Sequence, residues 1–170
     1  MEWYAIFVET GEEDMVQKCI EQFLAETDIK TLVPRRILVE RKGGKIYEKV
    51  RLLIPGYVLA YAHMDTHLYY QLKSIPRVYS VLKSEYDPVP IRQCEMELLL
   101  TLTREGETIG FSEIYKEGDK IQVIRGPLKG LEGIIQKCDR RKKRVKVALE
   151  FLGQLRRVDL GAYMVEKAST

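Results

Sequence analysis

The residues best suited to chemistry in this 170-residue chain are cations that gather near its C-terminus. Five consecutive cations, from Arg140 to Arg144, follow Asp139 at what we predict to be the tip of a hairpin. Repulsion among adjacent positive charges destabilises a chain unless an anion relieves it, and nucleic-acid phosphates supply anions at a suitable density. The predicted RNA-binding residues are Lys120, Arg125, Lys129, Lys137, Arg140, Arg141, Lys142, Lys143, Arg144, Lys146, Arg156 and Arg157.

This basic turn has two interpretations. On a structured RNA, the turn would clamp backbone phosphates, while Arg156 or Arg157 would contact bases. The alternative is a solvated turn without a ligand, because basic loops are common on soluble proteins. The local concentration of cations favours nucleic-acid binding.

The rest of the chain lacks the residues that an enzyme or a metal centre needs. The only two histidines, His63 and His67, have no third histidine or cysteine nearby, and Asp65 between them is better explained as a helix cap. No P-loop, Gly-x-Ser-x-Gly or paired-carboxylate pattern occurs, and Asp139 is typical of a turn former. We therefore predict no catalytic residue, no metal site and no cofactor.

The charge of the chain is unevenly distributed. Residues 1–117 hold 15 basic and 19 acidic side chains, a net charge of −4, whereas residues 118–170 hold 13 basic and 6 acidic ones, a net charge of +7. Such a step within a total of +3 indicates two modules, of which the second binds a polyanion.

Composition excludes several other classes of protein. A hydrophobic content of 45% is enough for a folded core. No apolar run approaches the roughly 18 residues of a membrane helix, and the segment from Met1 to Tyr4 lacks the features of a secretory signal. The three cysteines form no C-x-x-C pair, which makes a zinc or disulfide scaffold a poor interpretation. We expect a cytoplasmic monomer without membrane contact.

The first two-thirds of the sequence predict an α+β domain made of an antiparallel sheet with flanking helices. Apolar residues at helical spacing indicate helices over 12–25 and 91–103, and Asp65 or Thr66 would cap a shorter helix. Strands are expected over 2–9, 57–61 and 78–82, and Gly43-Gly44 marks a hairpin tip between basic residues. Residues 106–117 have no strong periodicity and are expected to form a linker.

The last third predicts a small all-β domain. Short strand-like runs alternate with glycine or charged turns, and the runs cover 120–125, 133–138, 144–151, 155–160 and 162–165. Five short strands in so few residues favour a closed barrel, because closure removes exposed strand edges. These strands would hold the basic turn at one of their hairpins.

Within this last third, the stretch from Gly118 to Gly133 resembles the KOW motif of transcription and ribosomal proteins. Glycines at 126, 130 and 133 supply the turns of that motif. The resemblance implies an SH3-like KOW barrel over residues 118–170.

The first two-thirds resemble a second known module. Trp3-Tyr4, Pro55 to Leu59, Pro76-Arg77-Val78 and Pro88 to Ile91 are similar in order and spacing to the N-terminal domain of the NusG family, called the NGN domain. This resemblance implies an NGN domain over 1–105 that binds the clamp region of RNA polymerase. By the same resemblance, its polymerase-binding residues would be Trp3, Tyr4, Ile54 and Tyr57, where Ile54 replaces an aromatic residue common in the family.

The strongly basic KOW segment is similar to that of specialised members of the family, the LoaP-type antiterminators, which a hairpin in the nascent RNA recruits. This resemblance implies a function in transcription elongation and antitermination. The implied partners are RNA polymerase and a nascent RNA hairpin. The resemblance does not decide whether the protein also contacts DNA at the transcription bubble. A housekeeping factor that couples polymerase to a ribosome or to Rho is one alternative. Another is a structural ribosome-associated RNA-binding protein. A refolding KOW domain of the RfaH type has little support, because the segment is strand-like throughout.

Overall fold

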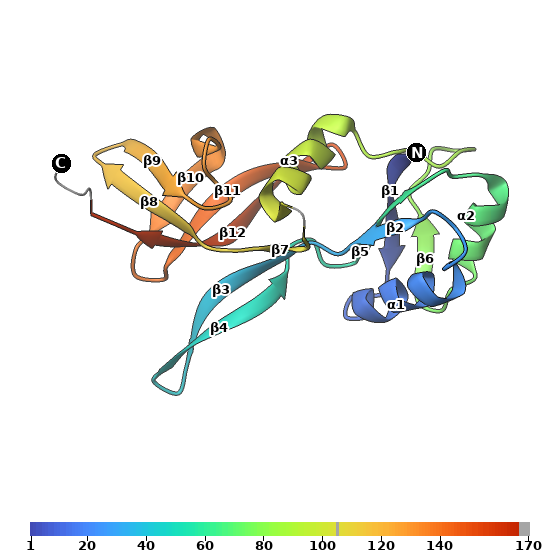
Figure 1. The fold of residues 1–170 in the computed structure, drawn as a ribbon, viewed down its shortest axis with the longest axis horizontal. Coiled ribbons are helices and arrows are strands. Elements are labelled where there is room, and N and C mark those ends of the chain that lie inside the picture. The colour runs from blue at the N-terminus through green and yellow to red at the C-terminus, as the bar shows by residue number, and fades with distance from the viewer. Residues whose placement is uncertain (105, 167–170) are drawn as a thin grey trace. The chain divides into compact units, whose positions relative to one another are not determined.

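A computed structural model describes residues 1–104 and 106–166 and divides the chain into two compact units (Figure 1). Unit 1 comprises Met1–Val33 and Ile54–Met96. Unit 2 comprises Pro34–Leu53 together with the described residues from Glu97 onward. The segment between residues 34 and 53 therefore groups with the basic C-terminal part of the chain.

Unit 1 is built on a four-stranded antiparallel sheet. Its strands stand in the order β2-β5-β1-β6 and its core includes the fully buried Ile6, Ile20 and Leu72. The strands are β1 (Glu2–Val8), β2 (Lys30–Leu32), β5 (Tyr57–Ala62) and β6 (Val78–Val81), and the helices wholly within the unit are α1 (Glu13–Phe23) and α2 (Thr66–Lys73). The antiparallel sheet with flanking helices predicted from the sequence is confirmed.

Two local signals in unit 1 act as predicted. The Asp65 side chain accepts a hydrogen bond from the Leu68 N–H at 2.7 Å and so caps α2. In α1, the buried Val16 and Ile20 lie on the apolar stripe that predicted this helix.

Unit 2 contains a curled five-stranded sheet (Figure 1). Its order is β10-β11-β12-β8-β9, antiparallel throughout except for the parallel pair of β8 with β12. The strands are β8 (Ser112–Glu117), β9 (Lys120–Arg125), β10 (Ile135–Asp139), β11 (Arg144–Phe151) and β12 (Gln154–Met164), with a short 3₁₀ helix η1 (Glu132–Ile134). The all-β KOW fold is confirmed, although among the described strands β9 and β10 are the open edges of the sheet and no pairing closes it.

The strands of this sheet differ in two places from those expected. Residues 106–117, expected as a linker, contain β7 (Thr108–Ile109) and β8, because the fully buried Ile114 anchors β8 beside the distant β12. Residues 155–160 and 162–165 form one strand, β12, through Gly161. There the glycine is not a turn, since a Cβ on it would lie 2.5 Å from the Ile37 carbonyl oxygen.

A second, three-stranded sheet completes unit 2. Its order is β4-β3-β7, where β3 (Arg35–Lys42) and β4 (Lys45–Leu52) form an antiparallel hairpin. Gly43 and Gly44 have φ values of 59° and 76° at its tip, as the sequence predicts. The remaining helix, α3 (Gln93–Thr103), spans the division between the units.

Candidate nucleic-acid and partner interfaces

Three neighbouring strands of unit 1 carry an exposed aromatic cluster, which consists of Phe7, Tyr57 and Tyr79. Phe7 stands directly opposite Tyr57 in the β1–β5 register, and their ring centroids are 5.5 Å apart. The Phe7 and Tyr79 centroids are 5.3 Å apart. Phe7 is 41% exposed and Tyr79 55% exposed. Grouped exposed aromatic rings are typical of a protein-binding surface rather than of a solvated face.

The four residues expected to bind polymerase separate into two pairs. Tyr57 belongs to the aromatic cluster, and the half-buried Trp3 packs against Tyr61 with ring centroids 5.2 Å apart. Tyr4 and Ile54 are only 7% and 4% exposed, so they lie in the core of unit 1. Burial, together with the neighbouring Glu2, raises the pKa of Tyr4. These two side chains support the sheet from within and do not form its surface.

Phe7 and Tyr79 are the residues that sequence reasoning missed on this surface. Phe7 lies four positions after Trp3 on β1, and side chains an even number apart in a strand share one face. That alternation could have identified Phe7 as a neighbour of the predicted site. Tyr79 carries no comparable signal, because its position depends on the pairing of β6 with β1.

A buried carboxylate fixes the turn that presents Tyr57. Glu13 is 1% exposed, and its two oxygens accept hydrogen bonds from the N–H groups of Gly11 and Gly56, the latter at 3.0 Å. Gly56 has a φ of 89°, a conformation that residues with a side chain rarely adopt. The first turn of α1 thereby holds the residue that precedes Tyr57.

Replacing this carboxylate should loosen unit 1. Glu13→Gln exchanges one acceptor oxygen for an amide that cannot accept, which leaves a buried N–H group unpaired. We expect a loss of about 1–3 kcal/mol in the free energy of unfolding, measured by chemical denaturation. Glu12→Gln is the matched control, since the Glu12 side chain makes no capping hydrogen bond. Equal stability of the two variants would contradict the role of Glu13.

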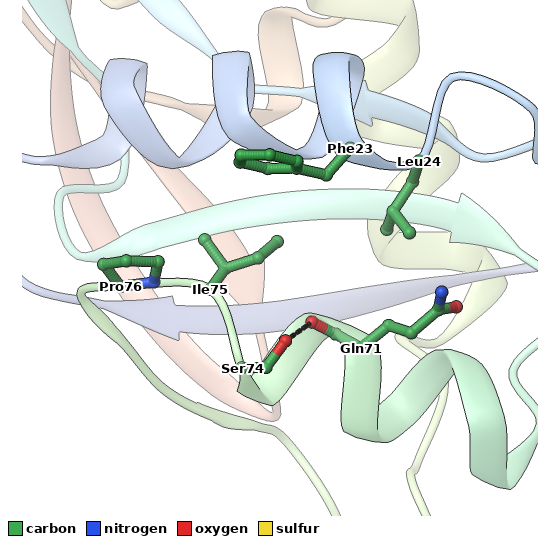
Figure 2. Close-up of a pocket in the computed structure, with 6 residues that line it drawn as sticks. All are labelled: Phe23, Leu24, Gln71, Ser74, Ile75 and Pro76. Atoms are coloured by element: carbon green, nitrogen blue, oxygen red, sulfur yellow. Dashed lines mark hydrogen bonds between the residues drawn. The ribbon is translucent and has the colours of Figure 1, made fainter.

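Unit 1 also has an apolar hollow at the C-terminal ends of α1 and α2 (Figure 2). Its volume is about 340 Å³, and Phe23, Leu24, Ile75 and Pro76 supply its apolar lining. The Ser74 hydroxyl donates to the Gln71 carbonyl oxygen at 2.7 Å. No side chain lining the hollow is charged, so this site is unsuited to a phosphate.

In unit 2, the basic turn between β10 and β11 presents its cations to solvent. Arg140, Arg141 and Lys142 are exposed, and the Asp139 carboxylate accepts a hydrogen bond from the Lys142 N–H at 2.9 Å. That hydrogen bond, helped by nearby lysines, holds the pKa of Asp139 below its usual value. Asp139 therefore shapes the turn as a carboxylate, which is the role that its position predicts.

Two residues at the end of the turn have other partners. The Lys143 ammonium lies over the Tyr163 ring, 5.7 Å from its centroid. Arg144 donates to the Val39 carbonyl oxygen at 3.0 Å and to the Asp159 carboxylate at 3.3 Å, and its side chain is 22% exposed. Arg144 thus ties β11 to β3 and β12, and it is less available to a ligand than the sequence suggests.

The other predicted RNA-binding cations are spread over the sheet. Arg125 pairs with Glu113 at 3.0 Å, and the Lys146 ammonium lies 4.0 Å from Asp159. The Arg156 guanidinium lies 5.5 Å from the centroid of the Phe151 ring, and Arg157 donates to Gln136 at 3.1 Å. The exposed lysines of this set are Lys120, Lys129 and Lys137. The densest group of exposed cations is therefore Arg140 to Lys142.

The two units of the structure divide the charge of the chain differently from the division at residue 117 that the sequence suggests. Unit 1 holds 6 basic and 12 acidic residues, and the described residues of unit 2 include 21 basic and 12 acidic ones, so their net charges are −6 and +9. The difference arises largely from the β3–β4 hairpin, where residues 35–52 carry seven cations and two carboxylates. The predicted set of RNA-binding residues omits this hairpin.

Within 1–104 and 106–166, no cluster of three or more His, Cys, Asp or Glu side chains is arranged to hold a metal ion. No helix in these ranges has the length and apolar character needed to span a membrane.

Comparison with known families gives two matches. The model described as "Transcription termination factor nusG" matches residues 1–100, and the KOW motif model matches residues 117–147. Together the two matches include the aromatic cluster of unit 1 and most of the basic β10–β11 region.

Individual relatives extend the likeness over the whole chain. The chain is 27% identical over 172 residues to the transcription termination/antitermination protein NusG of Yersinia pestis, which covers 97% of this chain and 95% of the relative. It is 25% identical to NusG of Helicobacter pylori, with 98% of each covered. A solved structure of Thermotoga maritima NusG is similar with a TM-score of 0.56 and 27% identity, over 94% of this chain and 93% of that one.

Proposed function

The chain belongs to the NusG family of transcription termination/antitermination proteins, and we propose that it binds elongating RNA polymerase with one domain and structured nascent RNA with the other. Members of this family are transcription factors and not enzymes, and polymerase binding is general among them. The proposed division follows the family resemblance, with an NGN domain over 1–105, a connection over 106–117 and a KOW domain over 118–170. We also propose that the protein acts as a monomer in the bacterial cytoplasm, where nascent RNA is made.

For the polymerase contact, we propose the aromatic cluster Phe7, Tyr57 and Tyr79 together with Trp3. The cluster offers rigid rings that lose little conformational entropy on binding, which is a property of interface anchors. Tyr4 and Ile54 belong to this proposal as the buried support of the sheet. The clamp region of polymerase is the expected partner surface, by family resemblance.

For the RNA contact, the observation that carries the proposal is the exposed turn Arg140 to Lys142. None of these three cations has a carboxylate within ion-pair distance among the described residues. Unpaired cations at this density bind phosphates by releasing counterions, and Arg can also contact base edges. This feature favours an RNA-recruited factor over a housekeeping factor whose KOW domain binds a ribosomal protein or Rho.

The experiment that tests the RNA proposal is selection with the full chain from a random-sequence RNA pool at about 150 mM salt. We expect the pool to become enriched in stem-loops that bind more tightly than unpaired RNA and duplex DNA of the same length. Uniform weak binding to all three polyanions would overturn specific RNA recognition. Ribosome binding without polymerase binding would instead favour the ribosome-associated alternative.

A further inference from the structure

A second basic element of unit 2 lies at the tip of the β3–β4 hairpin. Arg41, Lys42 and Lys45 are exposed there, and none of the three has a carboxylate within ion-pair distance among the described residues. The same absence of partners distinguishes Arg140, Arg141 and Lys142 in the β10–β11 turn. Unit 2 therefore carries two hairpins with exposed cations that form no ion pair among the described residues.

Contacts between β3 and the five-stranded sheet place these two hairpins beside each other. The Arg144 guanidinium, directly after the turn, donates to the Val39 carbonyl oxygen, two residues before Arg41. The Arg36 guanidinium donates to the Asp159 carbonyl oxygen at 2.8 Å. Gly161 permits a close approach, since a Cβ there would lie 2.5 Å from the Ile37 carbonyl oxygen. The turn and the hairpin are thus parts of one packed assembly within unit 2.

Two hollows that share lining residues are lined by cations of the hairpins. The first, of about 330 Å³, lies where the hairpins meet, and its lining is Val39, Glu40, Arg41, Arg141, Lys142 and Arg144. The second, of about 720 Å³, follows the β3–β4 hairpin through Lys42, Lys45 and Lys49. Glu40 and Arg41 line both hollows.

The electrostatics of these hollows suit a polyanion. Glu40 is the one carboxylate that lines them, and Arg51 donates to its two oxygens at 2.6 and 2.7 Å. The hydrogen bonds from Arg51 hold the pKa of Glu40 below its usual value, so the negative charge is present but already paired. The buried Nε–H of Arg144, beside the first hollow, donates to no acceptor among the described residues. Apart from Arg51 and Arg144, the cations that line the hollows have no carboxylate within ion-pair distance among the described residues.

We propose that the β3–β4 hairpin and the β10–β11 turn bind a single RNA stem together. Phosphates of one strand occupy the hollow between Arg41 and the pair Arg141 and Lys142, and the backbone continues along β3–β4 towards Lys45. The inference rests on the proposed binding of RNA by the turn and adds a second, separate element to it. An RNA stem suits two fixed rows of cations because its helix holds the phosphates at regular positions.

Single and double substitutions in the full chain test this proposal. The probe is a labelled RNA stem-loop, and its affinity for Arg41→Ala, Arg141→Ala and the double variant is measured by fluorescence anisotropy between about 50 and 200 mM salt. Loss of one phosphate contact changes the slope of log K against log salt by about 0.9, which corresponds to about eightfold weaker binding at 0.1 M salt. We expect this effect for Arg41→Ala as well as for Arg141→Ala. The matched control is Lys18→Ala, an exposed cation on α1 in unit 1, which should have no such effect.

The double variant and the stoichiometry distinguish one shared site from two separate sites. Because Arg41 and Arg141 line the same hollow and contact one RNA in this proposal, the salt slope of the double variant should fall by about twice the single-variant change, with one RNA bound per chain. Two RNA molecules bound per chain would show separate sites and overturn the proposal. Arg41 is exposed and unpaired, so Arg41→Ala should retain the wild-type thermal midpoint, which shows that the change in affinity does not come from unfolding.

The outcomes separate this inference from the proposed function. RNA binding that depends on Arg141 but not on Arg41 would overturn the joint site and leave RNA binding by the turn intact. RNA binding that is indifferent to both residues would overturn both statements. An Arg41→Ala variant that loses affinity for duplex DNA but not for the RNA stem-loop would assign the hairpin to DNA and overturn the joint RNA site.

Discussion

Replacing Arg140, Arg141, Lys142 and Lys143 together with glutamine is expected to weaken binding of the full chain to its RNA stem-loop by about a thousandfold at 0.1 M salt. The three exposed cations and the half-exposed Lys143 supply three to four phosphate contacts in this account. Each contact contributes about 0.9 to the salt slope, so the slope should fall by about three. Isothermal titration or anisotropy across a salt series measures both quantities.

Arg144 is left unchanged in this variant for a structural reason. Its guanidinium holds the Val39 carbonyl oxygen and the Asp159 carboxylate, so its removal would disturb the packing of unit 2 and confound the result. The matched control replaces four cations of unit 1, Lys18, Lys30, Lys73 and Lys83, with glutamine. Both variants lose the same charge. An equal loss of affinity in the two would mean that overall charge, and not the turn, binds the RNA.

The second large effect is expected at the aromatic cluster. Tyr57→Ala should weaken binding to RNA polymerase by about 2 kcal/mol or more, roughly thirtyfold, because it removes one ring of the aromatic anchor. The Tyr57 ring packs on Phe7, and the Phe7 ring in turn contacts Tyr79. Loss of the Tyr57 ring therefore also removes a packing contact from Phe7. The affinity is measured directly as binding of the full-length variant to polymerase core attached to a surface.

A second tyrosine of unit 1 provides the control for that measurement. Tyr86 is 81% exposed, and Tyr86→Ala removes the same atoms away from the cluster. If Tyr57→Ala and Tyr86→Ala bind polymerase as the wild-type chain does, the polymerase surface lies elsewhere on the molecule. A normal circular-dichroism spectrum and thermal midpoint for both variants would show that the sheet of unit 1 is intact.

Signals within short stretches of sequence predict much of this fold. The apolar stripe of α1, the Asp65 cap of α2 and the Gly43-Gly44 tip each depend on residues only a few positions apart. Their physical causes are helical periodicity, capping of free N–H groups and the tolerance of glycine for positive φ. The resemblance to the NGN and KOW modules agrees with the matches of both family models.

Features that depend on distant partners could not be predicted in the same way. Strand β8 has little pattern of its own, and besides its hairpin with β9 it pairs with β12, some fifty positions further along. Gly161 looks like a strand break, but the close carbonyl of Ile37 requires a residue without a Cβ there. Tyr4 and Ile54 look like surface residues by their place in the motif, although the packing of unit 1 buries both.

The candidate RNA site also combines features that nearby residues predict with features that depend on distant partners. The sequence predicts the basic turn, because five cations are adjacent. It does not predict that Arg144 is held by Val39, nor that Arg41 shares a hollow with Arg141, because a hundred positions separate the partners. Grouping the chain by the units of the structure enlarges the charge difference to −6 against +9, which places the β3–β4 hairpin with the basic turn.

The most direct test of the whole account is terminator read-through in a purified transcription system with bacterial RNA polymerase and the full chain. The template encodes a selected stem-loop in its leader, upstream of a terminator. The account predicts that read-through rises with the chain present, and that this rise is lost with Tyr57→Ala, with the turn variant, or when the stem is disrupted. A rise that persists after the stem is disrupted would contradict recruitment by structured RNA.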